Sequence, residues 1–148
     1  MADWTDNMVT DDEAIRRILQ QTRRIAVLGI KPEFRSFAPA HYVARYLQEV
    51  GYDVIPVPTY YPEVTEILGE SVYRTVAGVP GDVDMVDVFR RSHDIPPHVD
   101  DLLEKRPKVV WFQLGIRNDD AARRLAEAGI RVVQDRCSMV DHRRLIGR

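Results

Sequence analysis

The chain has 148 residues, of which 45% are hydrophobic and 30% are charged, proportions typical of one compact globular domain with its own core. Its formal net charge is -2, which argues against a general nucleic-acid or membrane-surface binder, because such proteins need an excess of lysine and arginine. Any anion that the protein binds must therefore be held by a local group of cations.

Cysteine usage and the apolar segments indicate the compartment. Cys137 is the only cysteine, which excludes an intramolecular disulfide and a cysteine-rich zinc site and suits a reducing environment. Residues 1–12 carry no apolar segment like that of an export signal, and no run approaches the roughly 18 apolar residues that a membrane span needs. We expect a cytoplasmic protein without a membrane-spanning segment.

The first part of the sequence predicts a helix, a strand and a second helix. Thr10 and Glu13 have capping-box spacing, and the apolar residues that follow recur on one face of a helix expected from Asp11 to Thr22. The short apolar run at residues 24–30 is typical of a strand that is buried on both faces. Helical spacing resumes at residues 42–50, and Gly51 supplies the stop.

The same alternation continues to the end of the chain. We expect further strands at residues 52–57, 84–89, 108–114 and 130–134, with helices around 99–103 and at 118–128. Residues 1–148 are predicted to form one domain. It would have an N-terminal helix within residues 1–22, a core of about residues 23–140 and a peripheral tail at 141–148.

Strands that alternate with helices pair in parallel through right-handed crossovers. The predicted fold is therefore a single α/β domain, a Rossmann-like, doubly wound sheet of five parallel strands in the order 3-2-1-4-5. In such sheets ligands bind beyond the carboxyl ends of the strands, where the strand order reverses. That point is expected between the first and fourth strands.

The turn after the first strand discriminates between nucleotide cofactors. Dinucleotide binding favours G-x-G-x-x-G there and an acidic residue about 20 positions later. Only Gly29 is present: Lys31 occupies the second glycine position, and the second strand ends in Pro56-Val57-Pro58 instead of an acid. NAD is therefore disfavoured, and no Walker P-loop sequence is present either.

The same loop carries cations just before a helix. Lys31, Arg35 and Ser36 precede a helix start near Pro39 and Ala40, and the backbone N–H groups of a helix N-terminus attract anions. The loop is a candidate anion site. Two cations that merely solvate an exposed loop would give the same pattern.

Several segments resemble the small bacterial CoA-binding domain proteins. They are residues 25–30, 40–47, 51–57, 86–91 and 110–115, and Asp135-Arg136-Cys137 fits the closing motif of that family. One departure is Ser36-Phe37-Ala38-Pro39, where many relatives have a Pro-Ser pair. The family is similar to the CoA-binding N-terminal domain of the succinyl-CoA synthetase α subunit, and the resemblance does not extend to the ligase domain with its phosphorylated histidine.

The resemblance implies a site for coenzyme A or an acyl-CoA at the carboxyl edge of the sheet. Arg90 and Arg91 would bind CoA phosphates, for which guanidinium groups are suited. Pro56 and Val57 would wall the adenine pocket or belong to the core, and Gly115 would admit a ligand close to the backbone or simply turn the chain. The expected binding residues are Gly29, Ile30, Lys31, Arg35, Ser36, Pro56, Val57, Phe89, Arg90, Gln113, Leu114 and Gly115.

Neither a catalytic residue nor a metal site is predicted. Cys137 has no histidine partner that the sequence identifies, and the histidines at positions 41, 93, 98 and 142 lack metal-binding spacing. Asp87 falls inside the third predicted strand, so it needs a partner such as an arginine or a backbone donor.

The leading hypothesis is a module that binds CoA, a small-molecule ligand, without catalysis of its own. One alternative is a non-catalytic CoA-binding subunit of an acyl-CoA ligase, for which the sequence names no protein partner. The other is a nucleotide-dependent oxidoreductase. Two features favour the first hypothesis: the turn after the first strand has a single glycine, and the resemblance is to a binding domain without its ligase domain.

Overall fold

The computed structural model describes residues 3–147, which form an α/β fold around one parallel five-stranded sheet. The strands are β1 (Arg24–Leu28), β2 (Asp53–Val57), β5 (Met85–Val88), β6 (Val109–Phe112) and β7 (Arg131–Val133). They are almost wholly buried because helices cover both faces of the sheet, which explains their continuous apolar runs.

The strand order is β2-β1-β5-β6-β7. The Rossmann-like parallel architecture is therefore confirmed, but β5, the third strand of this sheet, pairs with β1 and not with β2. The predicted neighbour of the third strand was wrong, and the order reverses between β1 and β5. The cause is the path of the connection at residues 58–84, which crosses β1 and places β5 on the edge of β1 opposite β2. No local sequence signal encodes on which side of a strand a crossover places the next one.

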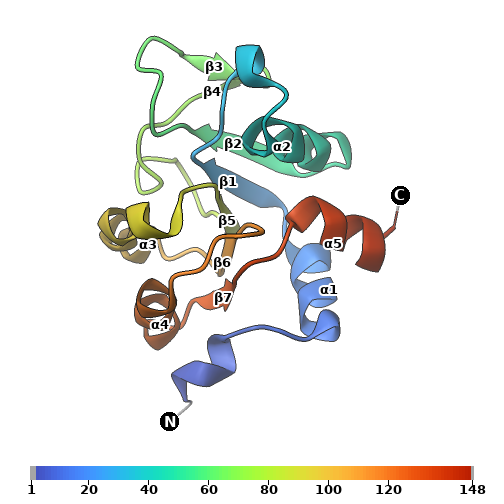
Figure 1. Ribbon diagram of the computed structural model, residues 1–148, viewed down its shortest axis with the longest axis vertical. Coiled ribbons are helices and arrows are strands. Elements are labelled where there is room, and N and C mark those ends of the chain that lie inside the picture. Colours follow the sequence, from blue (N-terminus) through green and yellow to red (C-terminus); the bar gives the residue numbers. More distant parts are fainter. Residues whose placement is uncertain (1–2, 148) are drawn as a thin grey trace.

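The helices form two layers (Figure 1). One face of the sheet carries α1 (Asp12–Gln21), α2 (Pro39–Glu49) and α5 (Ser138–Leu145), and the other carries α3 (Val99–Lys105) and α4 (Asp119–Glu127). Alternate residues of β1 serve the two cores: Ile25 and Val27 pack towards α1 and α2, whereas Ala26 and Leu28 pack towards α3 and α4.

The C-terminal segment differs from the expected peripheral tail. It forms α5, which packs against α1 and α2 and buries Asp141 and His142. Arg136 and Arg144 both pair with Asp141 and with Asp12 of α1. This ion-pair network fixes α5 beside α1. The charged residues of the sequence do not by themselves indicate which of them form pairs, so this arrangement was not predicted.

The connection between β2 and β5 holds a small hairpin that the sequence did not predict. It consists of β3 (Glu66–Ile67) and β4 (Glu70–Ser71), paired antiparallel. Short 3-10 helices complete the fold: η1 (Trp4–Asn7), η2 (Glu33–Arg35), η3 (Ser92–Asp94) and η4 (Pro96–His98).

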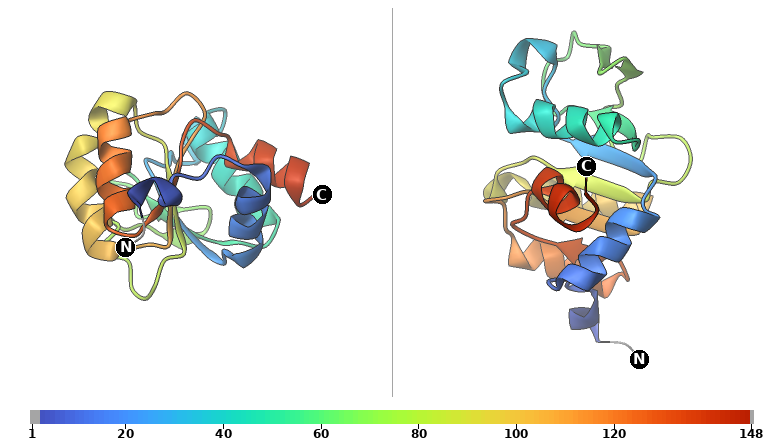
Figure 2. Two further views of the ribbon diagram at one scale, coloured as in Figure 1. Left: turned by 90° about the horizontal axis from the view of Figure 1, so that it is seen from below. Right: turned by 90° about the vertical axis from the view of Figure 1, so that its right-hand side faces the viewer.

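The hairpin and the N-terminal segment lie at opposite ends of the molecule (Figure 2). Met8 pairs with Val132 of β7 in a parallel bridge, and the Val9 N–H donates to the Val132 carbonyl at 2.8 Å. None of the helices between residues 3 and 147 has the length and apolar character needed to cross a membrane.

Candidate functional site

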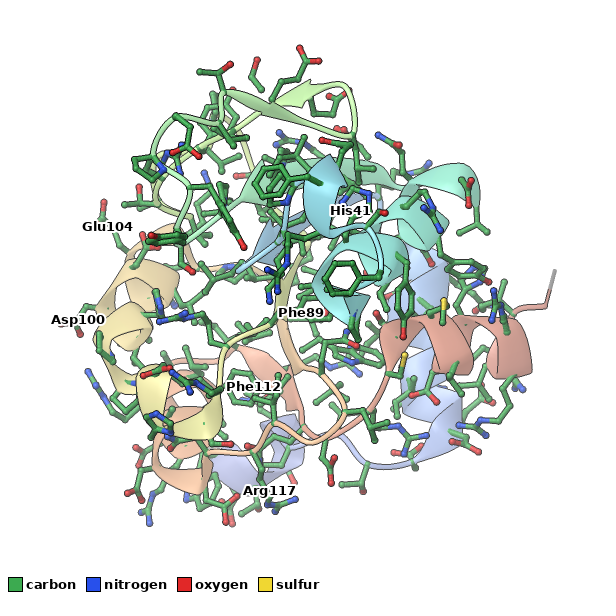
Figure 3. All side chains as sticks on the ribbon, turned by 45° about the horizontal axis from the view of Figure 1, so that its top comes forward. His41, Phe89, Asp100, Glu104, Phe112 and Arg117 are labelled. Atoms are coloured by element: carbon green, nitrogen blue, oxygen red, sulfur yellow. The ribbon has the colours of Figure 1, made fainter. Side chains whose placement is uncertain are left out.

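A cleft of about 490 Å³ opens at the carboxyl ends of β1, β5 and β6. Its walls come from the loop after β1 and the start of α2, the residues after β5, the turn after β6 and the residue before α5. Figure 3 shows Phe89 at the centre of the view, between His41 of α2 and Phe112 of β6. The cleft therefore lies where the strand order reverses, the usual ligand position in open α/β sheets.

The start of α2 is held against the loop after β1. The Lys31 N–H donates to the Ala40 carbonyl at 3.1 Å, and the buried His41 ring donates through Nδ1 to the Lys31 carbonyl at 2.8 Å. No side chain caps α2 among the described residues, and Ala38, Pro39 and Ala40 at its start line the cleft. Lys31 thus stands beside a helix N-terminus that suits an anion.

Gly29 brings the ends of β1 and β5 together. It has φ +88°, and a β-carbon there would strike the Phe89 carbonyl oxygen and lie 3.4 Å from Cδ of Arg90. Only glycine accepts both this backbone angle and this contact. The single glycine of the turn therefore positions Phe89 and Arg90 at the cleft.

Arg90 lies between the cleft and a second hollow. Its Nε donates to His98 Nε2 at 3.2 Å, and Nη1 donates to Thr59 Oγ1 at 3.3 Å. The hollow beyond it measures about 610 Å³ and is lined by Pro58, Thr59, Tyr60, Pro62, Arg74 and His98. The Arg74 guanidinium donates to the carbonyls of Tyr60, Tyr61, Pro62 and Val64, and it therefore fixes the loop that forms this hollow.

A buried polar cluster lies beneath the cleft. Gln113, which also lines the cleft, donates through Nε2 to Asp87 and to Ser138 Oγ, and Ser138 Oγ donates to Asp87 at 2.9 Å. Burial raises the pKa of Asp87 to about 7, against the two hydrogen bonds that lower it. The sequence predicted an arginine or a backbone donor as the partner of Asp87, but the structure places the side chains of a glutamine and a serine there.

Cys137 is half-buried, lines the cleft and forms the N-cap of α5. Within residues 3–147, no group of three or more His, Cys, Asp or Glu side chains is arranged to hold a metal ion. The polar residues that line the cleft thus supply cations, an amide, hydroxyl groups and a thiol.

Comparison with known proteins assigns the family. The sequence model of the CoA binding domain matches residues 23–143. The chain belongs to the CoA-binding domain family. YneT of Bacillus subtilis (strain 168) is 37% identical over 128 residues, which cover 86% of this chain and 91% of that protein. A solved structure from Thermus thermophilus is 42% identical with a TM-score of 0.84, covering 92% of this chain and 99% of the other.

The fold of this CoA-binding domain also occurs inside a longer enzyme. The dinucleotide-forming acetyl-coenzyme A synthetase 1 of Ca. Korarchaeum cryptofilum has a TM-score of 0.64 at 21% identity, and the match covers 80% of this chain but only 26% of the synthetase. At this identity the likeness shows a shared fold alone.

Half of the sequence-predicted binding residues line the cleft of this CoA-binding domain. They are Lys31, Phe89, Arg90, Gln113, Leu114 and Gly115. All of them follow the carboxyl end of a strand, and this position, together with the cations of the first loop and the family resemblance, allowed their prediction. Gly115 has φ +83° with open space around it, and its N–H donates to Asp135 Oδ1 at 2.6 Å.

The other half do not line the cleft. Ile30 and Val57 are buried in the cores. Pro56 lines a separate hollow that also includes Tyr73. Gly29 affects the cleft indirectly, by allowing the close approach of Phe89. Ser36 is exposed. Arg35 stacks its guanidinium on the Phe37 ring at 5.0 Å instead of reaching into the cleft.

Further cleft residues were not among the predicted binding residues. Tyr42 and Val43 of α2 and Ile116 after β6 contribute apolar walls, and Ser92 and Cys137 complete the rim. The sequence predicts Tyr42 and Val43 as part of a helix and gives them no binding role, and Val43 is buried as well. Tyr42 and Val43 are recognised as cleft residues only once the first turn of α2 is seen to lie across the ends of β1 and β5.

Proposed function

We propose that this protein binds coenzyme A or an acyl-CoA in the cleft at the ends of β1, β5 and β6. The observation that carries the proposal is the combination of three cations, Lys31, Arg90 and Arg91, with a largely apolar lining. Cations beside a helix N-terminus favour a phosphate, and apolar walls favour the body of an organic ligand. CoA has both parts.

The two hollows beside Arg90 suggest how such a ligand would lie. Arg90 reaches both of them, so its guanidinium suits a phosphate placed between two ends of an elongated molecule. We infer that the base lies towards Pro58 and Tyr60, which line the hollow beyond Arg90, and not against Pro56 and Val57, which do not line it. The pantetheine arm would then follow the cleft towards Cys137.

Binding without chemistry is the second part of the proposal. Family membership supports a binding role. The alternative, a CoA-binding subunit that completes an acyl-CoA ligase with a separate chain, predicts the same ligand but a protein partner as well. A thioesterase is a third case, which incubation of the purified protein with acetyl-CoA distinguishes. Release of free CoA thiol faster than the spontaneous hydrolysis of acetyl-CoA would identify it.

Calorimetric titration with CoA and dephospho-CoA tests the site. Loss of a charge-assisted bond to phosphate should make the Arg90→Ala variant bind CoA about ten- to a hundredfold more weakly. Arg17→Ala is the matched control, because Arg17 is an exposed arginine of α1. Arg35→Ala serves as a second comparison, and the geometry predicts a smaller loss than at Arg90.

Dephospho-CoA separates the phosphates. If Arg90 holds the pyrophosphate, Arg90→Ala should weaken both ligands equally; if it holds the 3′-phosphate, the effect should disappear with dephospho-CoA. Wild-type affinity for both ligands in a folded Arg90→Ala variant would show that the phosphate site is misplaced. Mass spectrometry of small molecules released from the native protein would name the bound acyl group.

A further inference from the structure

His98 contacts Arg90 from the side opposite the cleft. Its Nε2 lies 3.2 Å from Arg90 Nε, and the ring lines the hollow that also includes Thr59 and Arg74. His98 belongs to η4, immediately before α3, whereas Arg90 follows β5. The contact is therefore tertiary and depends on the docking of η4 against the end of β5.

The direction of this hydrogen bond defines the state of the imidazole. Arginine stays charged and only donates, so Nε2 must be the acceptor and His98 must be neutral with its proton on Nδ1. Burial lowers the pKa of His98 and the charge of Arg90 lowers it further, whereas Asp101 and Asp94 oppose the shift. The neutral acceptor form is therefore the one present at neutral pH.

The other charged groups around His98 have partners of their own, and one of them, Asp94, also lies near Arg90. Asp101 accepts from the backbone N–H groups of Val76 and Ala77, each at 2.8 Å. Asp94 lies 3.2 Å from Nε of Arg91 and 3.5 Å from His93, and 4.0 Å from Nη2 of Arg90.

Arg74 donates to the carbonyls of the loop at residues 60–64. None of these groups accepts a hydrogen bond from Arg90 Nε in the described structure. Among residues 3–147, His98 is the hydrogen-bond acceptor for Arg90 Nε.

We propose that His98 is a positioning residue for Arg90: its neutral imidazole holds the guanidinium between the cleft and the second hollow, and its protonation releases Arg90 and weakens binding of a phosphate-bearing ligand. This inference rests on the proposed function of the cleft. A protonated imidazole has no acceptor at Nε2 and places a second positive charge beside Arg90. The guanidinium would then turn away from His98, and Asp94 is the nearest carboxylate that could receive it.

Two properties therefore follow from one contact. The affinity for CoA should fall by about tenfold as the pH drops through the pKa of His98, below its ordinary 6.5. In the ligand-free protein, removal of the Arg90 charge should let the pKa of His98 rise towards its ordinary value.

The ligand-free measurement is an NMR titration of the histidine rings in the wild type and in Arg90→Gln. The pKa of His98 should rise in Arg90→Gln and stay unchanged in the control Arg17→Gln. An unchanged His98 titration in Arg90→Gln would overturn the coupling. This readout does not require CoA to bind, so it remains decisive if the proposed function fails.

The ligand measurement compares CoA affinity at pH 5.5 and 7.5 in three proteins. Glutamine retains an acceptor that does not titrate, so His98→Gln should bind like the wild type at pH 7.5 and lose less affinity at pH 5.5. The control His93→Gln should keep the wild-type profile, because His93 is exposed and contacts only Asp94 among the groups named above. Titration of the CoA phosphates affects all three alike, and identical profiles in all three would overturn the proposal.

Discussion

The α-carbon of Gly29, at the end of β1, packs directly against the carbonyl group of Phe89, at the end of β5. A β-carbon at position 29 would lie 3.0 Å from the Phe89 carbonyl carbon and closer still to its oxygen. Because both atoms belong to the backbone of the next strand, no rotamer change relieves the contact. The spacing of two neighbouring strands at the cleft therefore depends on the absence of a side chain.

Gly29→Ala should destabilise the protein more than Gly51→Ala. Both positions have positive φ, but a β-carbon at Gly51 meets nothing within 4 Å. Gly51→Ala should therefore cost about 1–2 kcal/mol for the backbone angle alone, and Gly29→Ala should cost this plus the displacement of Phe89. Urea unfolding of the two variants measures the difference, and equal losses would contradict a packing role for Gly29.

The stability of the protein should depend on pH through Asp87. Its pKa is raised from 3.8 to about 7, so between these values the unfolded chain releases the proton while the folded protein keeps it. Folding stability then falls as pH rises from about 4 to 7 and levels off above. Asp87→Asn lacks this titration.

The stability of the wild type relative to Asp87→Asn should therefore decrease between pH 4.5 and 8. Urea unfolding at both pH values provides the test, and the slope decides the outcome even if Asp87→Asn is less stable throughout. A difference that stays constant would mean that Asp87 ionises normally.

Thermal denaturation should separate CoA from the dinucleotides. CoA should raise the melting temperature because it binds the folded state alone, whereas NAD and NADP should not. The reason is the turn after β1, which has Gly29 but Lys31 in place of the second glycine. Equal shifts with NAD and CoA would remove the argument drawn from this turn.

Bound CoA should protect Cys137 from alkylation. The thiol is half-buried in the wall of the cleft, so a ligand in the cleft should cover it and slow its reaction with iodoacetamide. Cys137→Ser should leave the affinity for CoA largely intact under reducing conditions. Loss of all binding in the serine variant would make the thiol essential and favour a catalytic role.

Arg74→Ala should loosen the loop at residues 60–64 without unfolding the core. Arg74 is the donor to four carbonyl groups of that loop, and the exposed Tyr60 is a chymotrypsin site. Cleavage after Tyr60 or Tyr61 should become faster than in Arg45→Ala, an exposed arginine of α2. Unchanged cleavage would show that other contacts hold the loop.

The sequence predicted the strands well because each one is a short apolar run closed by a turn residue, as in residues 24–30. It did not predict that β5 lies beside β1. Side-chain patterns report burial, and β5 is buried on both faces in either position. The neighbour of a strand is decided by the path of a long connection, here residues 58–84, whose hairpin is too short to leave a periodic pattern.

The site was predictable to the extent that it follows from strand ends. Phe89, Arg90 and Gln113 were found in this way, and all three line the cleft. Arg35 was chosen for its charge and its loop, but a 3-10 turn directs it onto Phe37. The role of Tyr42 depends on the angle at which α2 crosses the sheet, and this angle is a property of packing.

The pairing of the N-terminal segment with Val132 affects the tendency of this protein to aggregate through its sheet edges. An outer strand with free N–H and carbonyl groups is a template for a strand from another molecule. Residues 8 and 9 occupy part of this template on β7, and at the other border the Tyr73 N–H donates to the Pro56 carbonyl of β2. Both borders of the sheet are thus partly occupied from within the chain, which limits edge-to-edge aggregation at high concentration.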